Sequence, residues 1–522
     1  MTIVNLKCGA VRGSTLKTWK NTEFHAFRGI PYAKPPLGEL RFKDPVPILP
    51  WKSVLDCTEE APMCPQPRKS SKETSEDCLR LNVYTKNVSE KLPVLVYIHG
   101  GGLYVGSGAS NDNGGPEYLM EKDIVLVTFN YRLGFLGFFN FGTPEYPGNA
   151  GFKDQVLALR WVKENISNFG GDSSKITLIG NSAGAMCVIL HTISPMSRNL
   201  FHQAIVASGG INFQTEIARN QKDLIKKQAE ILGIPHETDE KLIESFKNIP
   251  VERLVDTLYD NFAFGHDNPI FLWSYVIEDD HGQERFLIED PRKSLVNGRF
   301  SKIPIIAGVT ANELTTSAVD ILKNPELKDE FSQKFDEIAP ICFGYDRCDA
   351  EKSKIINETL KKSYKLEFPL TIEASLEPLS QLFSDAMIGF ANHRVVNIFR
   401  RHQKVFRYKF SFVGRHSFLH FPGNKPYGAE HCDDFAYLFV NRRYFPFFTE
   451  KDPEAKIIEC LTQFVRNFCH NGDPGMNWKP NTAEEDFFMN INETCELQQN
   501  LFAARYSVWE KLFPLVTFKE DE

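Results

Sequence analysis

Short apolar runs alternate with an amphipathic stretch along the first half of the chain. The runs cover Val94–Ile98, Ile124–Asn130 and Ile176–Ile179, and they are rich in Val, Ile and Leu. Such short runs are typical of buried β-strands. Between the second and third runs, Phe152–Asn168 repeats its apolar residues at helical spacing. This alternation predicts a sheet with helices on both faces.

The second half of the chain predicts mainly helices, interrupted by two further strands. Helical patterns occupy Asn212–Gly298, Pro325–Arg401 and Leu501–Leu512, and strand patterns occupy Ile303–Gly308 and Val405–Phe412. No low-complexity linker and no repeat of fixed period divides the chain. We therefore predict one α/β domain over residues 1–522. It would have a large, mostly parallel central sheet, helices on both faces and long helical insertions.

Composition and charge exclude several classes of function. The chain has 522 residues, 42% of them hydrophobic, which is enough for a large core. A net charge of −7, with both signs mixed along the chain, argues against nucleic acid as a main partner. No apolar run approaches the ~18 residues that a membrane span needs. The N-terminus lacks the apolar core of a secretory signal, so we expect a cytoplasmic protein with unmodified sequons.

The cysteines give no sign of a metal centre. There are eleven, an odd number, and they show no C-x-x-C pair and no zinc-like spacing. We expect most of them, including Cys187, Cys460 and Cys469, to be buried thiols. Neither a metal ion nor a cofactor is expected.

The stretch Gly180–Gly184 is the strongest chemical signal. It has the form G-x-S-x-G, follows the predicted strand Ile176–Ile179 and precedes an apolar segment that can continue as a helix. Strand, G-x-S-x-G and helix form the context of a nucleophile elbow, a strained turn that lifts a serine oxygen above the sheet. The flanking glycines avoid collisions with neighbouring backbone. We therefore predict that Ser182 attacks an acyl carbon.

A glycine-rich loop follows the strand Val94–Ile98. His99 is followed by three glycines, which expose successive backbone N–H groups to a substrate oxygen and match the H-G-G-G oxyanion motif. A dinucleotide loop does not fit, because the last glycine of its pattern is missing. A phosphate-binding P-loop does not fit either, because no Gly-Lys-Ser/Thr follows. The loop and the serine together favour acyl transfer.

Acyl transfer also needs a base and an acid that orients it. His431, in a polar loop after the strand Val405–Phe412, is the best-placed base, and His416 and His420 remain rivals. Glu313 follows the strand Ile303–Gly308, and the ends of strands are where catalytic groups gather in open α/β sheets. With 67 carboxylates in the chain, the residue types alone do not select the acid.

Several motifs along almost the whole chain resemble the carboxylesterase/cholinesterase family of α/β-hydrolases, and in particular insect soluble carboxylesterases. The motifs are Phe27–Ala33, Gly38–Phe42, Ser75–Val83, Pro147–Gly151 and Phe169–Asp172, together with the serine elbow. Chance agreement with all of them is negligible. The resemblance implies a serine esterase of α/β-hydrolase fold.

The resemblance also assigns residues, position by position. It implies Ser182 as nucleophile, Glu313 as acid, His431 as base and Gly101, Gly102 and Ala183 as oxyanion donors. It further implies that buried Ser208 supports the acid, that Arg41 pairs with Glu76 and Arg132 with Asp172, and that Cys64 and Cys78 form a disulfide. In a reducing cytoplasm the last two would still be neighbours.

The chain departs from the family pattern at four places near the predicted site. Asn181 stands where an acid or glutamine is common, Leu103 where phenylalanine is usual and Leu314 where glycine is usual. The tryptophan that often lines the acyl pocket is absent, and Phe213 is its candidate replacement. These departures bear on substrate preference more than on the type of reaction.

The leading hypothesis is a carboxylester hydrolase that detoxifies or sequesters lipophilic esters and reacts with organophosphates. A catalytically inactive adhesion or scaffold relative is one alternative, although all three triad residues are present. A choline esterase is disfavoured, because the loop Pro65–Asp77 has no tryptophan for a cation. A juvenile hormone esterase is a further alternative, although such enzymes usually carry glutamine at the position of Asn181.

Overall fold

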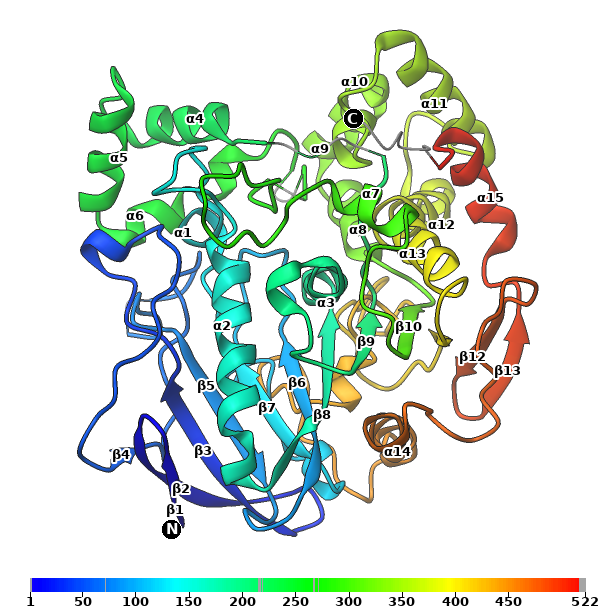
Figure 1. Cartoon of the computed structure of the whole chain (residues 1–522). Coiled ribbons are helices and arrows are strands. Elements are labelled where there is room, and N and C mark those ends of the chain that lie inside the picture. The colour runs from blue at the N-terminus through cyan, green and yellow to red at the C-terminus, as the bar shows by residue number, and fades with distance from the viewer. Residues whose placement is uncertain are drawn as a thin grey trace.

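A single mixed sheet runs through the molecule, and every named strand belongs to it (Figure 1). The computed structural model describes residues 2–70, 72–214, 217, 219–265, 268–270 and 272–515. From one edge to the other, the strand order is β1 (Thr2–Leu6), β2 (Gly9–Lys17), β3 (Glu23–Pro31), β5 (Arg80–Thr85), β7 (Val125–Phe129), β6 (Leu92–Ile98), β8 (Gly171–Asn181), β9 (Gln203–Ala207), β10 (Ile305–Thr310), β11 (Val405–Phe410), β12 (Phe487–Ile491) and β13 (Cys495–Gln499). The two-residue strand β4 (Leu55–Asp56) pairs with β2.

The centre of the sheet is parallel and its edges are antiparallel. All neighbours from β7 to β12 run parallel, whereas β1, β2, β3 and β5 at one edge and β13 at the other pair antiparallel. The carboxyl ends of the parallel strands therefore meet at one edge of the sheet, where α/β enzymes place their ligands. This confirms the α/β-hydrolase type of fold predicted from the sequence.

Helices cover both faces of the sheet and build the insertions. They are α1 (Gly134–Phe138), α2 (Ala150–Asn165), α3 (Ala183–Ile193), α4 (Lys222–Leu232), α5 (Asp239–Asn248), α6 (Val251–Asp256), α7 (Pro291–Val296), α8 (Thr315–Lys323), α9 (Pro325–Gln333), α10 (Phe335–Cys342), α11 (Ala350–Ser363), α12 (Ile372–Phe383), α13 (Phe390–Phe399), α14 (Ala455–Asn471) and α15 (Ala503–Leu512). A π-helical segment, Ser384–Gly389, joins α12 to α13. Short 3₁₀ turns lie at Gly38–Leu40, Leu119–Glu121, Ile166–Phe169, Pro195–Ser197, Tyr259–Asn261 and Phe435–Tyr437.

Alternation along β6 shows how the sheet divides the core. Val94, Val96 and Ile98 pack into the core that also holds α2 and α3, whereas Leu95 and Tyr97 pack into the core under α14. Successive side chains of a strand point to opposite faces, so a strand buried on both sides is apolar throughout. A third core lies among α8–α13 and α15.

The structure confirms the predicted strands and corrects one helical region. The helix expected over Phe152–Asn168 begins at Ala150 and ends at Asn165, followed by a 3₁₀ turn. Within Asn212–Gly298 the structure has α4–α7, but its described residues between Phe262 and Asp290 contain no helix. Proline and glycine interrupt this segment and break a helical pattern. No helix among the described residues is long and apolar enough to cross a bilayer.

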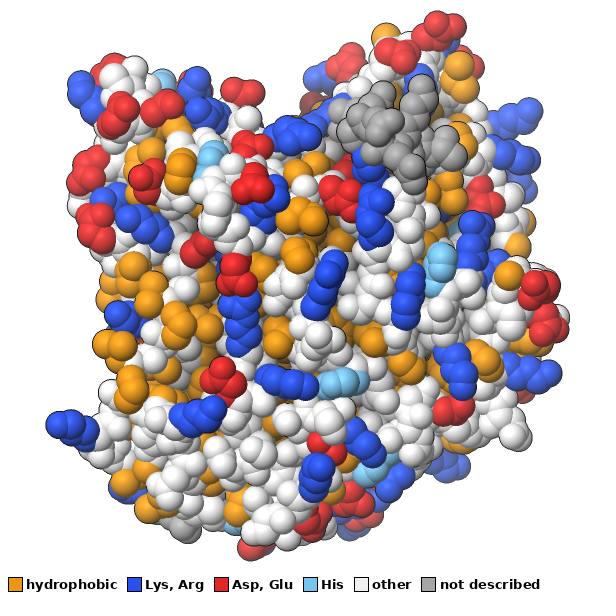
Figure 2. Space-filling model, in the orientation of Figure 1, with side chains coloured by type: hydrophobic (Ala, Val, Ile, Leu, Met, Phe, Trp, Pro, Cys, Tyr) orange, Lys and Arg blue, Asp and Glu red, His pale blue; other side chains and the backbone are white. Residues whose placement is uncertain are grey.

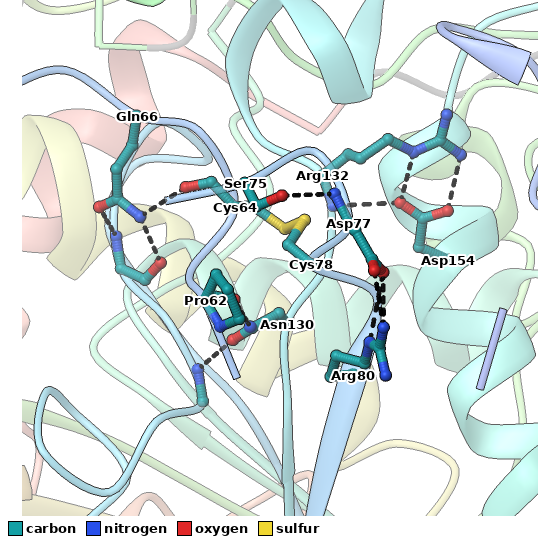
Figure 3. The surroundings of a disulfide bond; sticks show 12 residues. Pro62, Cys64, Gln66, Ser75, Asp77, Cys78, Arg80, Asn130, Arg132 and Asp154 are labelled. Carbon is teal, nitrogen blue, oxygen red and sulfur yellow. Dashed lines mark hydrogen bonds and ion pairs between the residues drawn. A yellow bond between two sulfur atoms is a disulfide. The ribbon is translucent and has the colours of Figure 1, made fainter. Parts of the chain in front are cut away.

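Of the two ion pairs implied by the family resemblance, one is confirmed and the other is wrong. Arg41 contacts Glu76 at 2.5 Å. Arg132, however, pairs with Asp154 of α2 at 2.7 Å, and both side chains are buried (Figure 3). Asp172 instead accepts hydrogen bonds from the backbone and hydroxyl of Ser174. Arg132 follows β7 and faces the first turns of α2, so Asp154 is the carboxylate within its reach.

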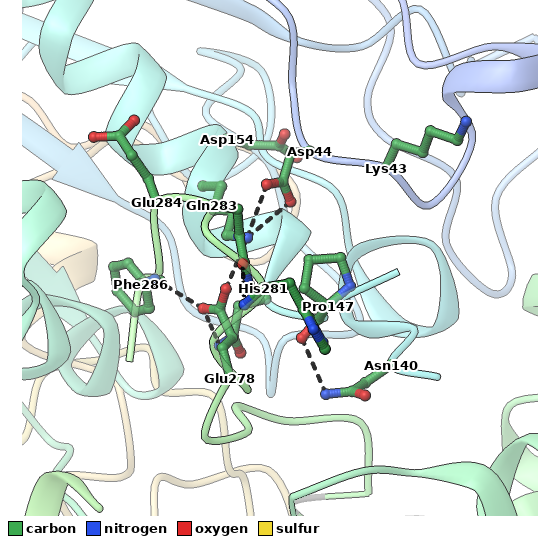
Figure 4. Close-up of polar contacts among 12 residues, drawn as sticks. Lys43, Asp44, Asn140, Pro147, Asp154, Glu278, His281, Gln283, Glu284 and Phe286 are labelled. Atoms are coloured by element: carbon green, nitrogen blue, oxygen red, sulfur yellow. Dashed lines mark hydrogen bonds and ion pairs between the residues drawn. The ribbon is translucent and has the colours of Figure 1, made fainter. Parts of the chain in front are cut away.

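The disulfide between Cys64 and Cys78 is present, as the resemblance implied (Figure 3). A polar network, buried except at Asp44, connects α2 to the irregular segment before α7 (Figure 4). In it, Lys153 contacts Asp44 at 2.9 Å and Glu278 at 2.8 Å, and Glu278 also accepts a hydrogen bond from the Phe286 N–H.

On the face drawn in Figure 2, Lys and Arg side chains are interspersed with Asp and Glu.

Candidate active site

Ser182 lies at the turn between β8 and α3, with φ 56° and ψ −126°. This left-handed backbone is strained for a residue with a side chain, and such strain is typical of a nucleophile elbow. A Cβ on Gly180 would lie 2.3 Å from the carbonyl oxygen of Gly184, and a Cβ on Gly184 would lie 2.2 Å from that of Ile98. Both glycines are therefore required by close backbone packing, as expected from the motif.

Glu313 and His431 are in direct contact. The two atoms Glu313 Oε2 and His431 Nδ1 are 2.5 Å apart. The other carboxylate oxygen accepts the Thr310 N–H at 2.7 Å, and the Glu313 N–H donates to Ser384 Oγ at 3.3 Å. Glu313 is fully buried, so its carboxylate is held by these partners rather than by water. In the described part of the chain, neither rival histidine named above contacts Glu313.

The charge around His431 favours its protonated form. Burial lowers the pKa of His431, but the neighbouring Cys432 and the Glu313 carboxylate outweigh burial and raise the pKa well above its ordinary value. An opposite charge in contact stabilises an imidazolium ion. A base of this kind readily accepts the proton of a hydroxyl nucleophile, once its own ring is neutral at the start of the reaction.

Ser182 and His431 come to the same end of the sheet from different strands. Ser182 follows β8, Glu313 follows β10 and His431 lies in the loop after β11. No hydrogen bond joins the Ser182 hydroxyl to His431 among the described residues, and such contacts in free enzymes often form only with substrate bound. Gly100 lies close to both residues. It borders the cavity beside His431, and a Cβ on it would lie 3.1 Å from the Cβ of Ser182.

The glycine loop and α3 present backbone N–H groups beside the serine. Gly101 and Gly102 have φ of 106° and 63°, and a Cβ on Gly101 would lie 2.1 Å from the carbonyl oxygen of Val105. Neither of their N–H groups donates within the part of the chain that the structure describes. Ala183 is the first residue of α3, so its N–H has no acceptor inside the helix. Three donors are therefore available to an oxyanion.

A cavity of about 290 Å³ opens beside His431. Its walls include the aromatic rings of Phe418, Phe435 and Phe439 and the polar side chains of Asn181 and Cys432. These walls are mainly apolar, so the cavity suits an apolar group.

Comparisons with known proteins agree with this geometry. Residues 1–509 match the family model described as "Carboxylesterase family". The chain belongs to the carboxylesterase family. Among curated relatives of this carboxylesterase, a juvenile hormone esterase of Tribolium castaneum is 34% identical over 91% of this chain and 85% of its own length. Esterase E4 of Myzus persicae is 30% identical over 96% of this chain and 92% of its own length.

A solved structure shares the fold. The crystal structure of juvenile hormone esterase from Manduca sexta, with OTFP covalently attached, matches with a TM-score of 0.85 and 27% identity. The match covers 98% of this chain and 99% of that chain. The protein is therefore a serine hydrolase of carboxylic esters, acting on small ester substrates.

The structure also places Ser208, Leu103 and Phe213, which the sequence analysis named in this carboxylesterase. Ser208 is fully buried, and its hydroxyl has no hydrogen-bond partner among the described residues. The polar contacts of Glu313, apart from His431, are with Thr310 and Ser384. Leu103 is fully buried in the main core and does not line the cavity beside His431. Phe213 is half-buried against the same core and also lies outside that cavity.

Leu314 keeps the backbone that its position requires. Its φ is 53°, in the left-handed region that glycine adopts without strain. The family's usual glycine therefore has a conformational reason here, and the carboxylesterase tolerates a leucine because its side chain packs against the third core. Asn181, the other departure beside the nucleophile, is buried and donates from Nδ2 to Cys432 Sγ at 3.1 Å.

The sequence reasoning missed a group of residues around the base. Cys432 directly follows His431 in the sequence, and this adjacency was the sign that its sulfur could lie beside the imidazole. Burial raises the pKa of Glu430 and of Asp433 to about 7, and that of Asp434 to about 6. Asp433 accepts hydrogen bonds from Ser417 Oγ and from the Glu430 N–H, which fixes the loop that carries His431.

Proposed function

We propose that this carboxylesterase hydrolyses lipophilic esters through Ser182, His431 and Glu313. His431 takes the hydroxyl proton as Ser182 attacks the acyl carbon, and Glu313 orients and stabilises the imidazolium that forms. The observation that carries the proposal is the 2.5 Å contact between Glu313 and His431 at the end of the sheet that bears the serine elbow.

The second half of the cycle uses the same groups. The oxyanion of each tetrahedral intermediate would accept hydrogen bonds from the N–H groups of Gly101, Gly102 and Ala183, which lie beside the elbow. His431 then gives its proton to the leaving alcohol, so the alcohol oxygen must lie on the His431 side. A water molecule activated by His431 hydrolyses the acyl-enzyme and frees Ser182.

The cavity beside His431 supports an apolar alcohol group as the preferred substrate feature. Its aromatic rings favour hydrocarbon, and burial would exclude water from the leaving oxygen. The biological role we propose is detoxification of lipophilic or xenobiotic esters, with organophosphates as covalent inhibitors of Ser182. The cytoplasmic location stays a prediction, and the Cys64–Cys78 disulfide, a bond typical of oxidising compartments, weighs against it.

Juvenile hormone hydrolysis is the second candidate function. Relatives named juvenile hormone esterase are found both among the curated proteins and among the solved structures. Asn181 in place of glutamine beside the nucleophile is the feature of this chain that argues for a different preference. The two candidates share the same chemistry and differ only in the group that each binds.

One experiment tests the proposed function in two stages. Hydrolysis of p-nitrophenyl butyrate should fall by about 10⁴-fold or more in Ser182→Ala. Ser208→Ala removes a buried hydroxyl that has no hydrogen-bond partner in the described part of the chain, and it should retain most activity. Turnover unchanged in Ser182→Ala would overturn the mechanism. A panel of esters with graded acyl and alcohol groups, with juvenile hormone included, then decides between the two substrate classes by their kcat/KM.

A further inference from the structure

Two free cysteines that do not line the cavity beside His431 lie in contact with each other. Cys460 on α14 and Cys495 at the start of β13 are separated by 35 residues, and their sulfur atoms are 3.1 Å apart. Both are partly buried, and they belong to the nine cysteines outside the Cys64–Cys78 bond. A disulfide has a sulfur–sulfur distance of about 2.05 Å, so a movement of about 1 Å joins the two.

The two thiols share one hydrogen bond, which either sulfur can donate. Cys495 is the less deeply buried of the two. Because burial disfavours a thiolate, Cys495 is the thiol that ionises at the lower cost. An acidic thiol beside a protonated one is the arrangement of an attacking and a resolving cysteine.

A small thiol compound has room to reach the pair. Both cysteines line a cavity of about 620 Å³, which lies between the first turns of α14, the loop after β11 and the turn from β12 to β13. Lys456 and Glu493 border the same cavity and are exposed, so the cavity is open to solvent. Thiol–disulfide exchange needs such access to the attacking sulfur.

We propose that Cys460 and Cys495 form a second disulfide by exchange with a low-molecular-weight disulfide of the glutathione type. The Cys495 thiolate attacks one sulfur of the small disulfide, which forms a mixed disulfide and releases one small thiolate. Cys460 then attacks the Cys495 sulfur, passes its proton to the departing group and releases the second small thiol. Two protein thiols are oxidised by two electrons, and one small disulfide is reduced to two thiols.

The new bond would fasten two separate parts of the fold. α14 covers one face of the central sheet, and the β12–β13 hairpin forms an edge of that sheet (Figure 1). A cross-link restricts the unfolded chain most when it closes a long loop. Oxidation should therefore raise the unfolding temperature, while the residues around Ser182 keep their arrangement.

The test uses the intact protein in glutathione buffers of graded ratio, followed by acid quenching, alkylation and non-reducing peptide mapping. As the buffer becomes more oxidising, a peptide linked through Cys460 and Cys495 should appear, and alkylation of both should fall together. The unfolding temperature should rise in parallel. Absence of the linked peptide in the most oxidising buffer, with Cys64–Cys78 intact, would overturn the proposal.

Single variants show which thiol attacks. In oxidised glutathione, Cys460→Ser should keep one glutathione on Cys495, because the resolving thiol is missing, and Cys495→Ser should take up glutathione several-fold more slowly. Neither variant should gain thermal stability on oxidation. Cys348→Ser, a partly buried cysteine elsewhere, is the matched control and should behave as the wild type. Equal glutathione uptake by Cys460→Ser and Cys495→Ser would contradict the assigned roles.

Discussion

Asn181 donates a hydrogen bond from its side-chain nitrogen to the sulfur of Cys432 at 3.1 Å. The contact joins the residue before Ser182 to the residue after His431, across 251 positions of sequence. The Tyr97 hydroxyl holds the other end of the Asn181 amide at 3.0 Å. Asn181, one of the departures from the family pattern, is therefore linked through Cys432 to the loop that carries His431.

The first prediction concerns Cys432→Gly. Cys432 has φ 71°, a conformation that glycine adopts without strain, so the loop should keep its shape. Because Cys432 contributes to the raised pKa of His431, its removal should lower that pKa. The acidic limb of kcat/KM, measured with p-nitrophenyl butyrate, should then move to lower pH. An unchanged limb, or a shift to higher pH, would contradict this role of Cys432.

The second prediction concerns Glu313→Gln. Neutral His431 is the active form, so kcat/KM rises with pH through the pKa of His431 in the free enzyme. The Glu313 carboxylate helps to raise that pKa, so its loss should move the acidic limb to lower pH. The rate on the plateau should fall by about 10³–10⁴-fold, because an amide no longer stabilises the imidazolium. A variant with the wild-type pH profile would show that Glu313 isn't the acid.

The third prediction concerns the glycine after the nucleophile. Alanine at Gly184 would place its Cβ 2.2 Å from the carbonyl oxygen of Ile98, so α3 or β6 must move. We expect a loss of stability of about 3 kcal/mol, measured by denaturant unfolding, and a loss of most esterase activity. Gly38→Ala is the control, since a Cβ there meets nothing within 4 Å and only left-handed strain of about 1 kcal/mol is added. Similar losses in both variants would refute the steric explanation.

The fourth prediction compares the contributions of Asp154 in α2 and Asp172 in β8 to stability. Asp154→Asn leaves the Arg132 guanidinium buried without its charged partner, which should lower the free energy of unfolding by about 3–5 kcal/mol. Asp172→Asn should cost only about 1 kcal/mol, because Asp172 mainly accepts hydrogen bonds from Ser174. Chemical denaturation of the two variants measures both values. A larger loss of stability in Asp172→Asn than in Asp154→Asn would contradict the pairing of Arg132 with Asp154.

The parts of the fold that follow from local pattern were predictable from sequence. The apolar run of β6 predicted a strand, because a strand that is buried on both faces is apolar throughout. The two glycines around Ser182 predicted the elbow, because a side chain at either position would collide with neighbouring backbone. The irregular segment before α7 was mistaken for helix, because its polar composition is compatible with a surface helix until its contacts are known.

The parts that depend on long-range packing were not predictable in the same way. The contact of Asn181 with Cys432 and the pairing of Arg132 with Asp154 depend on how separate elements approach one another. The same holds for the surroundings of the Ser208 hydroxyl, which has no partner among the described residues. The family resemblance carried residue types to these positions but not their orientations. A carboxylate in the buried first turns of α2, such as Asp154, was the available sign that an arginine must lie opposite.

The central claim is that Ser182 is the nucleophile, and the most direct test is to map the covalent adduct of an organophosphate. The intact enzyme is inactivated, digested and analysed by mass spectrometry, with the lost activity compared with the fraction of Ser182 modified. We predict one phosphoryl group per chain, on Ser182, in proportion to the activity lost. Full inactivation with Ser182 unmodified would contradict the account.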